Sequence, residues 1–208
     1  MQNVVRYTMR TSKFILTPCL VIICANSCSI AKQNNDSINF PNTDSIYIAS
    51  TISLMSNKIP DSVFKMKNLR SIHISGMDCD LGLHDDSKAN DGIKCWMISR
   101  VPPEIQNLKL LDTLDISLGT FTKLPDEIST LKNIRVIVLT DCNINNIDNL
   151  MLLTTLTELF LDGTGVNKLP ANIGNLKHLK YLGLVNNNVD NSEIVRIKAA
   201  LPDCEINY

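Results

Sequence analysis

The feature that most constrains the fold of this chain is an apolar pattern that recurs at nearly constant spacing. The pattern reads apolar-x-x-apolar-x-apolar, and its middle positions at 114, 137, 159 and 182 lie 23, 22 and 23 residues apart. A unit of this length cannot bury its apolar side alone, but stacked copies share one continuous core. The sequence therefore predicts a repeat protein. The clearest copies are Leu69/Ile72/Ile74, Leu111/Leu114/Ile116, Ile134/Ile137/Leu139, Leu156/Leu159/Leu161 and Leu179/Leu182/Leu184.

A second signature, an aliphatic residue followed by proline, completes the repeat. It is seen as Leu124-Pro125 and Leu169-Pro170, and Ile147-Asp148 replaces it in the 22-residue copy. Apolar residues then follow at spacings of 4, 3 and 3, which indicates a short helical segment, whereas apolar-x-apolar indicates a strand. Each repeat is thus predicted to hold a strand, a turn and a short helical return. Strands are expected near residues 46, 72, 114, 137, 159, 182 and 206, which gives about seven turns.

The combined string resembles the leucine-rich repeat, in the variant of about 23 residues that carries Leu-Pro, over roughly residues 44–208. The resemblance implies an α/β solenoid with a parallel sheet on its concave face and short helical or 3-10 segments on its convex face. Cys142 and Asn187 occupy the position where the family keeps a buried Asn or Cys bonded to turn backbone, and Gly119 and Thr164 replace it in two turns.

Both ends of the repeat region look like caps, and one repeat is enlarged. An irregular first strand is predicted at Ile46 and Ile48, and a C-terminal cap at 192–208 comprises a helix to Ala200 and a last strand near Ile206. The insertion, at about 77–100, is expected either to be a decoration without a ligand or to bind a partner.

The insertion holds two cysteines, Cys79 and Cys95, which in an exported protein are the natural disulfide pair. Its acidic residues do not match the spacing of an EF-hand loop, and His84 lacks the partners of a zinc site, so no metal is expected.

The N-terminal segment differs from the rest of the chain. Residues 1–27 hold three basic and no acidic residues. The basic residues precede an apolar run from Phe14 to Ala25, an arrangement that is typical of a secretory signal peptide. The stretch Ala25–Cys28 resembles a bacterial lipobox, which implies lipidation of Cys28 as the mature N-terminus. Ala25 stands where a large aliphatic is usual, so plain secretion stays open. Residues 28–43 are predicted to be a flexible tether, and the protein is expected in the cell envelope, on an outer or cell-surface membrane through a lipid anchor.

The charge and the residue pattern of the chain argue against two function classes, nucleic-acid-binding proteins and enzymes. The chain of 208 residues has a net charge of −1, but removal of residues 1–27 leaves 17 basic and 21 acidic residues, a net charge of −4. Such a chain lacks the basic excess of a nucleic-acid-binding protein. No Ser/His/Asp, Cys/His or paired-carboxylate arrangement stands out in the sequence, so no enzyme, no catalytic residue and no cofactor is expected.

The residues between the core positions of the strands would face outward and form a ligand surface. In the later turns this surface has an apolar centre with an acidic rim, the composition of a protein-binding patch, although strand propensity alone also favours Val and aromatic residues. We expect a monomer that binds a protein ligand. The predicted ligand-binding residues are Asp115, Val136, Val138, Glu158, Phe160, Asp162, Tyr181 and Val185.

Two alternatives remain from the sequence. One is an intracellular leucine-rich repeat scaffold protein of Ras-suppressor type with an uncleaved N-terminus and reduced cysteines. The other is an enzyme with its site in the insertion.

Overall fold

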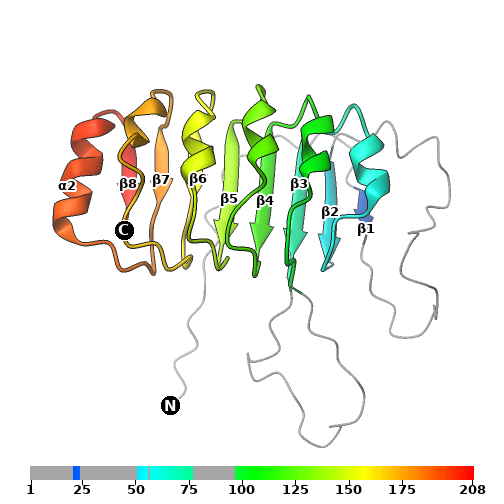
Figure 1. Cartoon of the computed structure of the whole chain (residues 1–208), viewed down its shortest axis with the longest axis horizontal. Coiled ribbons are helices and arrows are strands. Elements are labelled where there is room, and N and C mark those ends of the chain that lie inside the picture. Colours follow the sequence, from blue (N-terminus) through cyan, green and yellow to red (C-terminus); the bar gives the residue numbers. More distant parts are fainter. Residues whose placement is uncertain (1–20, 24–50, 56, 77–96) are drawn as a thin grey trace, which may run out of the picture.

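The computed structural model describes residues 21–23, 51–55, 57–76 and 97–208. Within these residues, one parallel sheet of eight strands runs along the molecule in chain order, and short helices lie beside it (Figure 1). The strands are β1 (Val21–Ile23), β2 (Thr51–Met55), β3 (Ser71–Ser75), β4 (Thr113–Ser117), β5 (Val136–Thr140), β6 (Glu158–Phe160), β7 (Tyr181–Gly183) and β8 (Glu205–Asn207). The helices are the 3-10 helices η1 (Asp61–Lys65), η3 (Pro103–Asn107), η4 (Asp126–Thr130), η5 (Asp148–Leu152) and η6 (Ile173–Asn175), and the α-helix α2 (Asn191–Ala200).

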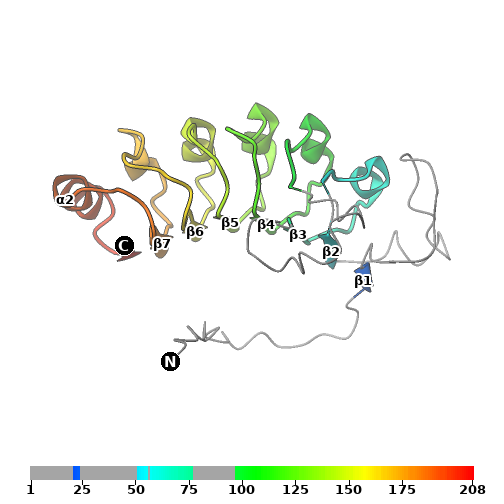
Figure 2. The same ribbon diagram turned by 90° about the horizontal axis from the view of Figure 1, so that it is seen from below.

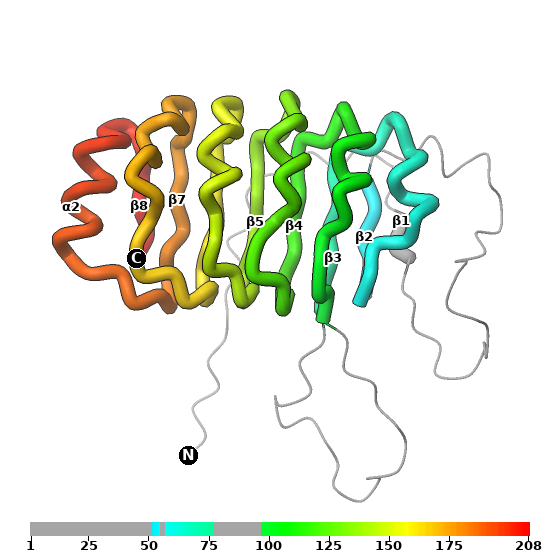
Figure 3. The backbone as a smooth tube through the Cα atoms, in the orientation of Figure 1, coloured from blue at the N-terminus to red at the C-terminus, as the bar shows by residue number. Residues whose placement is uncertain are grey.

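The described turns stack into a curved solenoid. Each turn of backbone returns beside the previous one (Figure 3), and strands β2 to β7 line the inner side of an arc whose outer side carries the helices (Figure 2). Hydrogen-bonded strands must stay about 4.8 Å apart, whereas the helices have no such constraint and spread more widely. The α/β solenoid predicted from the repeat is therefore confirmed.

The core is built from columns of equivalent residues, one residue per turn. The register places Ile72, Leu114, Ile137, Leu159 and Leu182 opposite one another on successive strands, and all of them are buried. A second column is contributed by the helical segments: Ile105, Ile128, Leu150 and Ile173 are also fully buried. The period seen in the sequence is thus the period of this stacked core.

The aliphatic–proline pairs start the helical segments. Pro102 and Pro125 are the N-cap residues of η3 and η4, and their carbonyls accept hydrogen bonds from the N–H groups of Ile105 and Ile128 at 3.1 and 3.0 Å. Proline has a φ suited to this position and no N–H to leave unpaired. Ile147 does the same in the shorter repeat, where its carbonyl accepts from Leu150 N at 3.0 Å.

The predicted buried Asn/Cys positions bond the turns together. Asn187 Nδ2 donates to the Leu161 and Leu184 carbonyls at 2.7 and 3.0 Å, and Cys142 Sγ contacts the Ile116 carbonyl at 3.4 Å. Thr164 fills the equivalent position by donating to the Leu161 carbonyl at 2.7 Å. Burial raises the pKa of the Cys142 thiol to about 11, as expected for a structural, reduced cysteine.

The turn that follows each strand uses left-handed backbone at a fixed position. Positive φ occurs at Leu118, Asp141, Gly163 and Asn186, which lie 23, 22 and 23 residues apart. Gly and Asn adopt this conformation easily, whereas leucine is strained in it. Leu118 is therefore a point of local strain that the rest of the turn maintains.

The ends of the solenoid agree with the sequence at one end and differ at the other. The C-terminal cap forms as expected, with α2 starting after Asp190 and Ile206 of β8 opposite Leu182. At the N-terminal end, Ile46 and Ile48 lie outside the described residues, and the strand that pairs with β3 begins later in the chain than expected. The strand beside β3 is β2, which places Ile52 opposite Ile72 and Leu54 opposite Ile74.

Several predictions concern residues outside the described ones. Cys28, Cys79 and Cys95 are among these, as are the whole tether and most of the insertion. Of the predicted signal segment, Val21–Ile23 pairs with β2, and signal cleavage and lipidation stay predictions. After the insertion, the first buried residue of the next repeat is Ile98. Its carbonyl accepts a hydrogen bond from Thr120 N at 2.9 Å. No helix in the described ranges has the length and apolar character to cross a bilayer.

Candidate functional site

The predicted ligand-binding residues lie on adjacent strands of the inner face. Val138 is opposite Asp115 and Phe160, and Glu158 is opposite Val136 and Tyr181. Their side chains are half-buried or exposed, whereas the residues between them on each strand are buried. The structure therefore brings together one surface, which we call the concave patch: Asp115, Val136, Val138, Glu158, Phe160, Asp162, Tyr181 and Val185. Ligand binding by this patch stays a prediction.

An aromatic pair forms the centre of the concave patch. The rings of Phe160 and Tyr181 have centroids 4.8 Å apart and planes tilted by 34°. The Tyr181 hydroxyl also accepts a hydrogen bond from Asn207 Nδ2 at 3.2 Å. Both rings are thus held before any ligand arrives, which reduces the entropy that binding would lose.

The carboxylate of Asp162 is positioned by the absence of a side chain at a neighbouring glycine. Gly183 is opposite Phe160, and a Cβ at this position would lie 2.7 Å from Asp162 Oδ2. The absence of a Cβ lets the Asp162 carboxylate lie across the backbone and accept a hydrogen bond from Val185 N at 2.7 Å. Partial burial raises the pKa of Asp162 above its usual value, so a cation placed beside it would be favoured.

In the described strands, the inner face carries acidic residues and His73 but no Lys or Arg. The outward positions of β2 to β8, together with Asp162 and Val185, include four acidic residues and no Lys or Arg. The acidic residues are Asp115, Glu158, Asp162 and Glu205. An apolar centre surrounded by carboxylates is complementary to a partner that presents basic and apolar side chains.

A hydrogen-bonded chain on β3 and β4 was not visible in the sequence. Ser71 Oγ lies 2.9 Å from His73 Nε2, and His73 Nδ1 lies 3.0 Å from Asp115 Oδ2. Ser71 and His73 share a face because they are two residues apart on a strand, and the register sets Asp115 opposite His73. The insertion separates His73 from Asp115 by 42 residues, so only the strand pairing reveals the contact.

This chain has the connectivity of a Ser-His-Asp triad but lacks its other parts. Acyl transfer also needs donors that stabilise the oxyanion. The neighbouring N–H groups of Asp112 and Thr113 already donate to the Arg70 carbonyl, at 2.8 and 2.9 Å. The His73 and Asp115 side chains are 41% and 31% exposed, so water is not excluded. We therefore interpret the chain as an ordering contact at the edge of the concave patch.

Metal ligands do not converge in the part of the chain that the structure describes. No group of three or more His, Cys, Asp and Glu residues there could hold an ion. The two cysteines in this part, Cys142 and Cys204, are both free.

Comparison with solved structures gives matches for most of the chain. A leucine-rich repeat protein of Leptospira interrogans is 27% identical with a TM-score of 0.58, over 76% of this chain and 35% of that one. An internalin of Listeria monocytogenes is 19% identical with a TM-score of 0.54, over 76% of this chain and 40% of that one. The structure of a TDR receptor is 24% identical with a TM-score of 0.52, over 70% of this chain and 24% of that one.

No protein-family model matches the sequence, and a search of curated proteins finds no match. The chain spans well under half the length of the solved proteins that it matches.

The fold and the geometry of its inner face define a class, the parallel-strand solenoids built from short repeats. The repeat length, the leucine columns, the buried Asn and Cys positions and the structural neighbours then identify the fold. This chain has the leucine-rich repeat fold.

Proposed function

We propose that this protein is exported, anchored by lipid at Cys28, and recognises a protein partner through its concave patch. It has no catalytic role in this proposal. The observation that carries the proposal is the composition of the inner face, where a preformed aromatic pair and valines are surrounded by carboxylates with no basic residue between them. Interfaces enriched in aromatic residues and complementary in charge are typical of specific protein recognition.

The same chemistry describes the contacting part of the partner. A Lys or Arg side chain would be attracted to Asp162 and Glu158, and its alkyl portion could pack on the rings of Phe160 and Tyr181. The partner segment is therefore a basic one with apolar residues beside the charges. The open inner face, curved along its length, suits an extended segment or a convex domain surface (Figure 2).

Export is supported by the sequence of residues 1–28, with its basic start, apolar run and small residues before Cys28. Mass spectrometry of the mature N-terminus in a bacterial host tests this part. An acylated Cys28 is the expected result. An intact Met1 would overturn export and favour the intracellular scaffold.

Site-specific photocrosslinking tests the concave patch in living cells. A photoreactive amino acid is placed at Val138 in the patch or at Ser129 on the outer side, and the crosslinked peptides are identified. We expect adducts from position 138 that disappear when Phe160 and Tyr181 are replaced by Ala. Equal adducts from both positions, or adducts that survive the double replacement, would contradict recognition by this patch.

A further inference from the structure

A second surface, on the side of the solenoid, is basic. It consists of the side chains between each helical segment and the start of the next strand, and we call it the basic flank. Its equivalent positions recur in each turn because the backbone there forms a hydrogen-bonded ladder, in which Arg135 N donates to Asp112 O, Thr157 N to Arg135 O, and Lys180 N to Thr157 O. The cationic members are Lys67, Arg70, Lys109, Lys132, Arg135, Lys177 and Lys180, with His178 beside them.

The positive charge of the basic flank is largely unneutralised. Two acidic residues lie in these segments, Asp203 in the last turn and Asp112. The Asp112 Oδ2 lies 3.7 Å from Arg135 Nε, longer than a charge-assisted hydrogen bond. None of the ion pairs of the described residues involves Lys132, Lys177 or Lys180. A chain with a net charge of −1 thus concentrates cations on one side and carboxylates on the inner face. Like charges held together repel one another, and a bound anion would relieve that repulsion.

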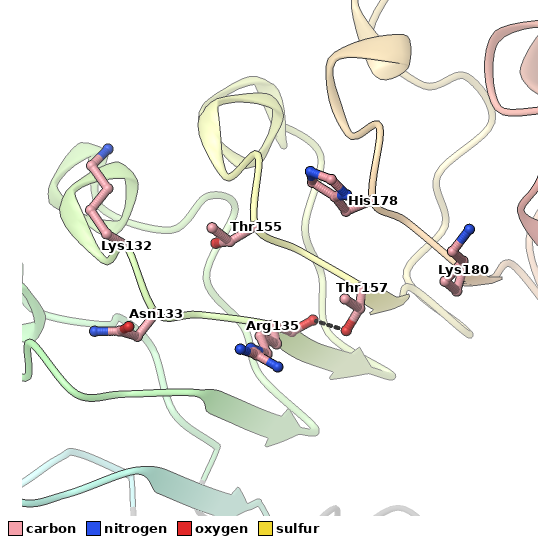
Figure 4. A pocket seen from close by; sticks show the side chains of 7 residues that line it. All are labelled: Lys132, Asn133, Arg135, Thr155, Thr157, His178 and Lys180. Carbon is pink, nitrogen blue, oxygen red and sulfur yellow. Dashed lines mark hydrogen bonds between the residues drawn. The ribbon is translucent and has the colours of Figure 1, made fainter.

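A hollow of about 350 Å³ lies within the basic flank. It is lined by Lys132, Asn133, Arg135, Thr155, Thr157, His178 and Lys180, and no carboxylate lines it (Figure 4).

The hydrogen-bond donors in the hollow favour an anion over a neutral ligand. The hydroxyls of Thr155 and Thr157 donate to the Ile134 and Arg135 carbonyls at 2.7 and 3.1 Å, so their protons are already used. The Asn133 amide donates to the Lys109 carbonyl at 2.7 Å. Lys132 Nζ donates one of its hydrogen bonds to the Ser129 carbonyl at 2.9 Å. The donors left for a ligand therefore belong mainly to the charged groups of Arg135 and Lys180 and to the remaining N–H groups of Lys132.

The spacing of the cations suits a linear polyanion. Neighbouring strands lie about 4.8 Å apart, so Arg135 and Lys180, two strands apart, are separated by roughly 10 Å, and the flank from Arg70 to Lys180 extends over roughly 20 Å. In the flank segments from Lys67 to Lys180, the one apolar side chain that is not buried is Leu110, and none of the residues there is aromatic and able to insert into a bilayer. A charged strip with a hollow fits a chain of charges better than a flat lipid surface.

We propose that the basic flank binds an anionic polysaccharide, with one sulfate, phosphate or carboxylate group seated in the hollow. This site is separate from the concave patch, so the two surfaces can be occupied at the same time. If the proposal of polysaccharide binding fails, the proposed protein recognition by the concave patch is unaffected.

Binding to heparin, a sulfated polysaccharide, tests the proposal with the full chain. The variant K132Q/R135Q/K180Q neutralises the hollow, and the control R100Q/K168Q/K198Q removes the same number and type of charges elsewhere. All three flank side chains are exposed, so folding is expected to be preserved, and circular dichroism checks this. Because each released counterion contributes to the salt dependence, the flank variant should bind at least about tenfold more weakly with a shallower salt slope. The control should bind like the wild type.

Three results would overturn the proposal. One is equal weakening in the flank and control variants, which would indicate net charge alone. Another is binding to neutral dextran as strong as binding to heparin. The third is flank-dependent binding to phosphatidylglycerol vesicles without binding to heparin, which would assign the flank to a membrane surface. Should the triple variant fold poorly, K132Q/K180Q compared with K168Q/K198Q makes the same test.

Discussion

Replacement of Glu193 by Ala is expected to destabilise the C-terminal end of the solenoid strongly. The Glu193 side chain is 6% exposed, and its Oε1 accepts hydrogen bonds from Leu169 N at 2.8 Å and from Arg196 Nη2 at 2.6 Å. Its Oε2 accepts from Arg196 Nε at 2.8 Å, and Arg196 Nη2 also donates to the Leu169 carbonyl at 2.9 Å. Glu193 and Arg196 therefore join α2 to the turn before it.

The expected loss in the free energy of unfolding follows from the groups that E193A leaves without hydrogen-bond partners. The buried N–H of Leu169 would lose its acceptor, which costs about 1–3 kcal/mol, and the lost charged hydrogen bonds add to this. Arg196 is one-third exposed and can turn toward water, so the cost stays below that of a fully buried broken pair. We expect a loss of about 3 kcal/mol in the free energy of unfolding, which at a urea m-value of about 2–3 kcal/mol/M lowers the midpoint by about 1 M.

Urea denaturation followed by circular dichroism measures the loss, and hydrogen exchange of the α2 amides locates it. The control is E104A, since Glu104 is an exposed carboxylate on η3, far in the sequence from α2. A midpoint shift below about 0.3 M, or unchanged exchange in α2, would refute the coupling of helix and turn.

The dependence of this effect on pH has a definite sign. The hydrogen bonds from Arg196 lower the pKa of Glu193, so its contribution is present above the usual glutamate pKa of about 4.3 and is lost as the pH falls through the lowered value. Wild type and E193A should therefore converge in stability in acid. A gap that stayed constant down to the acid-unfolding region would contradict a charged Glu193.

Further predictions concern single residues of the inner face and the turns. L118G should raise the free energy of unfolding by up to about 1 kcal/mol in urea denaturation, because glycine removes the strain of a positive φ of 59°. Cys142, with a pKa of about 11, should remain unlabelled by thiol reagents at pH 8 until the protein unfolds, as followed by peptide mass spectrometry. A fluorophosphonate probe should not label Ser71; labelling that S71A or H73Q abolished would show a working nucleophile and contradict the proposal that the protein has no catalytic role.

The sequence predicted the repeat and its core because one leucine or isoleucine per turn is a strong periodic signal. The same period placed the outward residues of β3 to β7 correctly, since the side chains of a strand alternate. The strand beside β3 was expected too early in the chain because the spacing from Ile52 to Ile72 is 20 residues, shorter than in later turns. In the sequence, Ile46 and Ile48 offer the same alternation as Ile52 and Leu54.

Contacts between turns were harder to predict than the turns themselves. The link from His73 to Asp115 depends on strand register across a 42-residue separation, and the burial of Glu193 depends on how α2 meets the preceding turn. Neither contact leaves a local pattern in the sequence. His178 is exposed, and its position beside Lys180 and Thr155 emerged only with the structure.

The separate acidic and basic surfaces of this solenoid are possible because each column of equivalent surface residues can vary without affecting the others. The core requires apolar residues at a few positions in each turn and leaves the remaining positions free. A column on the inner face can therefore become acidic, as at Asp115, while a column on the flank becomes basic, as at Arg135, without a cost in packing. Because the two surfaces share no side chain, charge changes on the flank should alter anion binding without altering the concave patch. Opposite behaviour, in which K132Q/R135Q/K180Q abolished crosslinks from position 138, would show that the two surfaces form a single site.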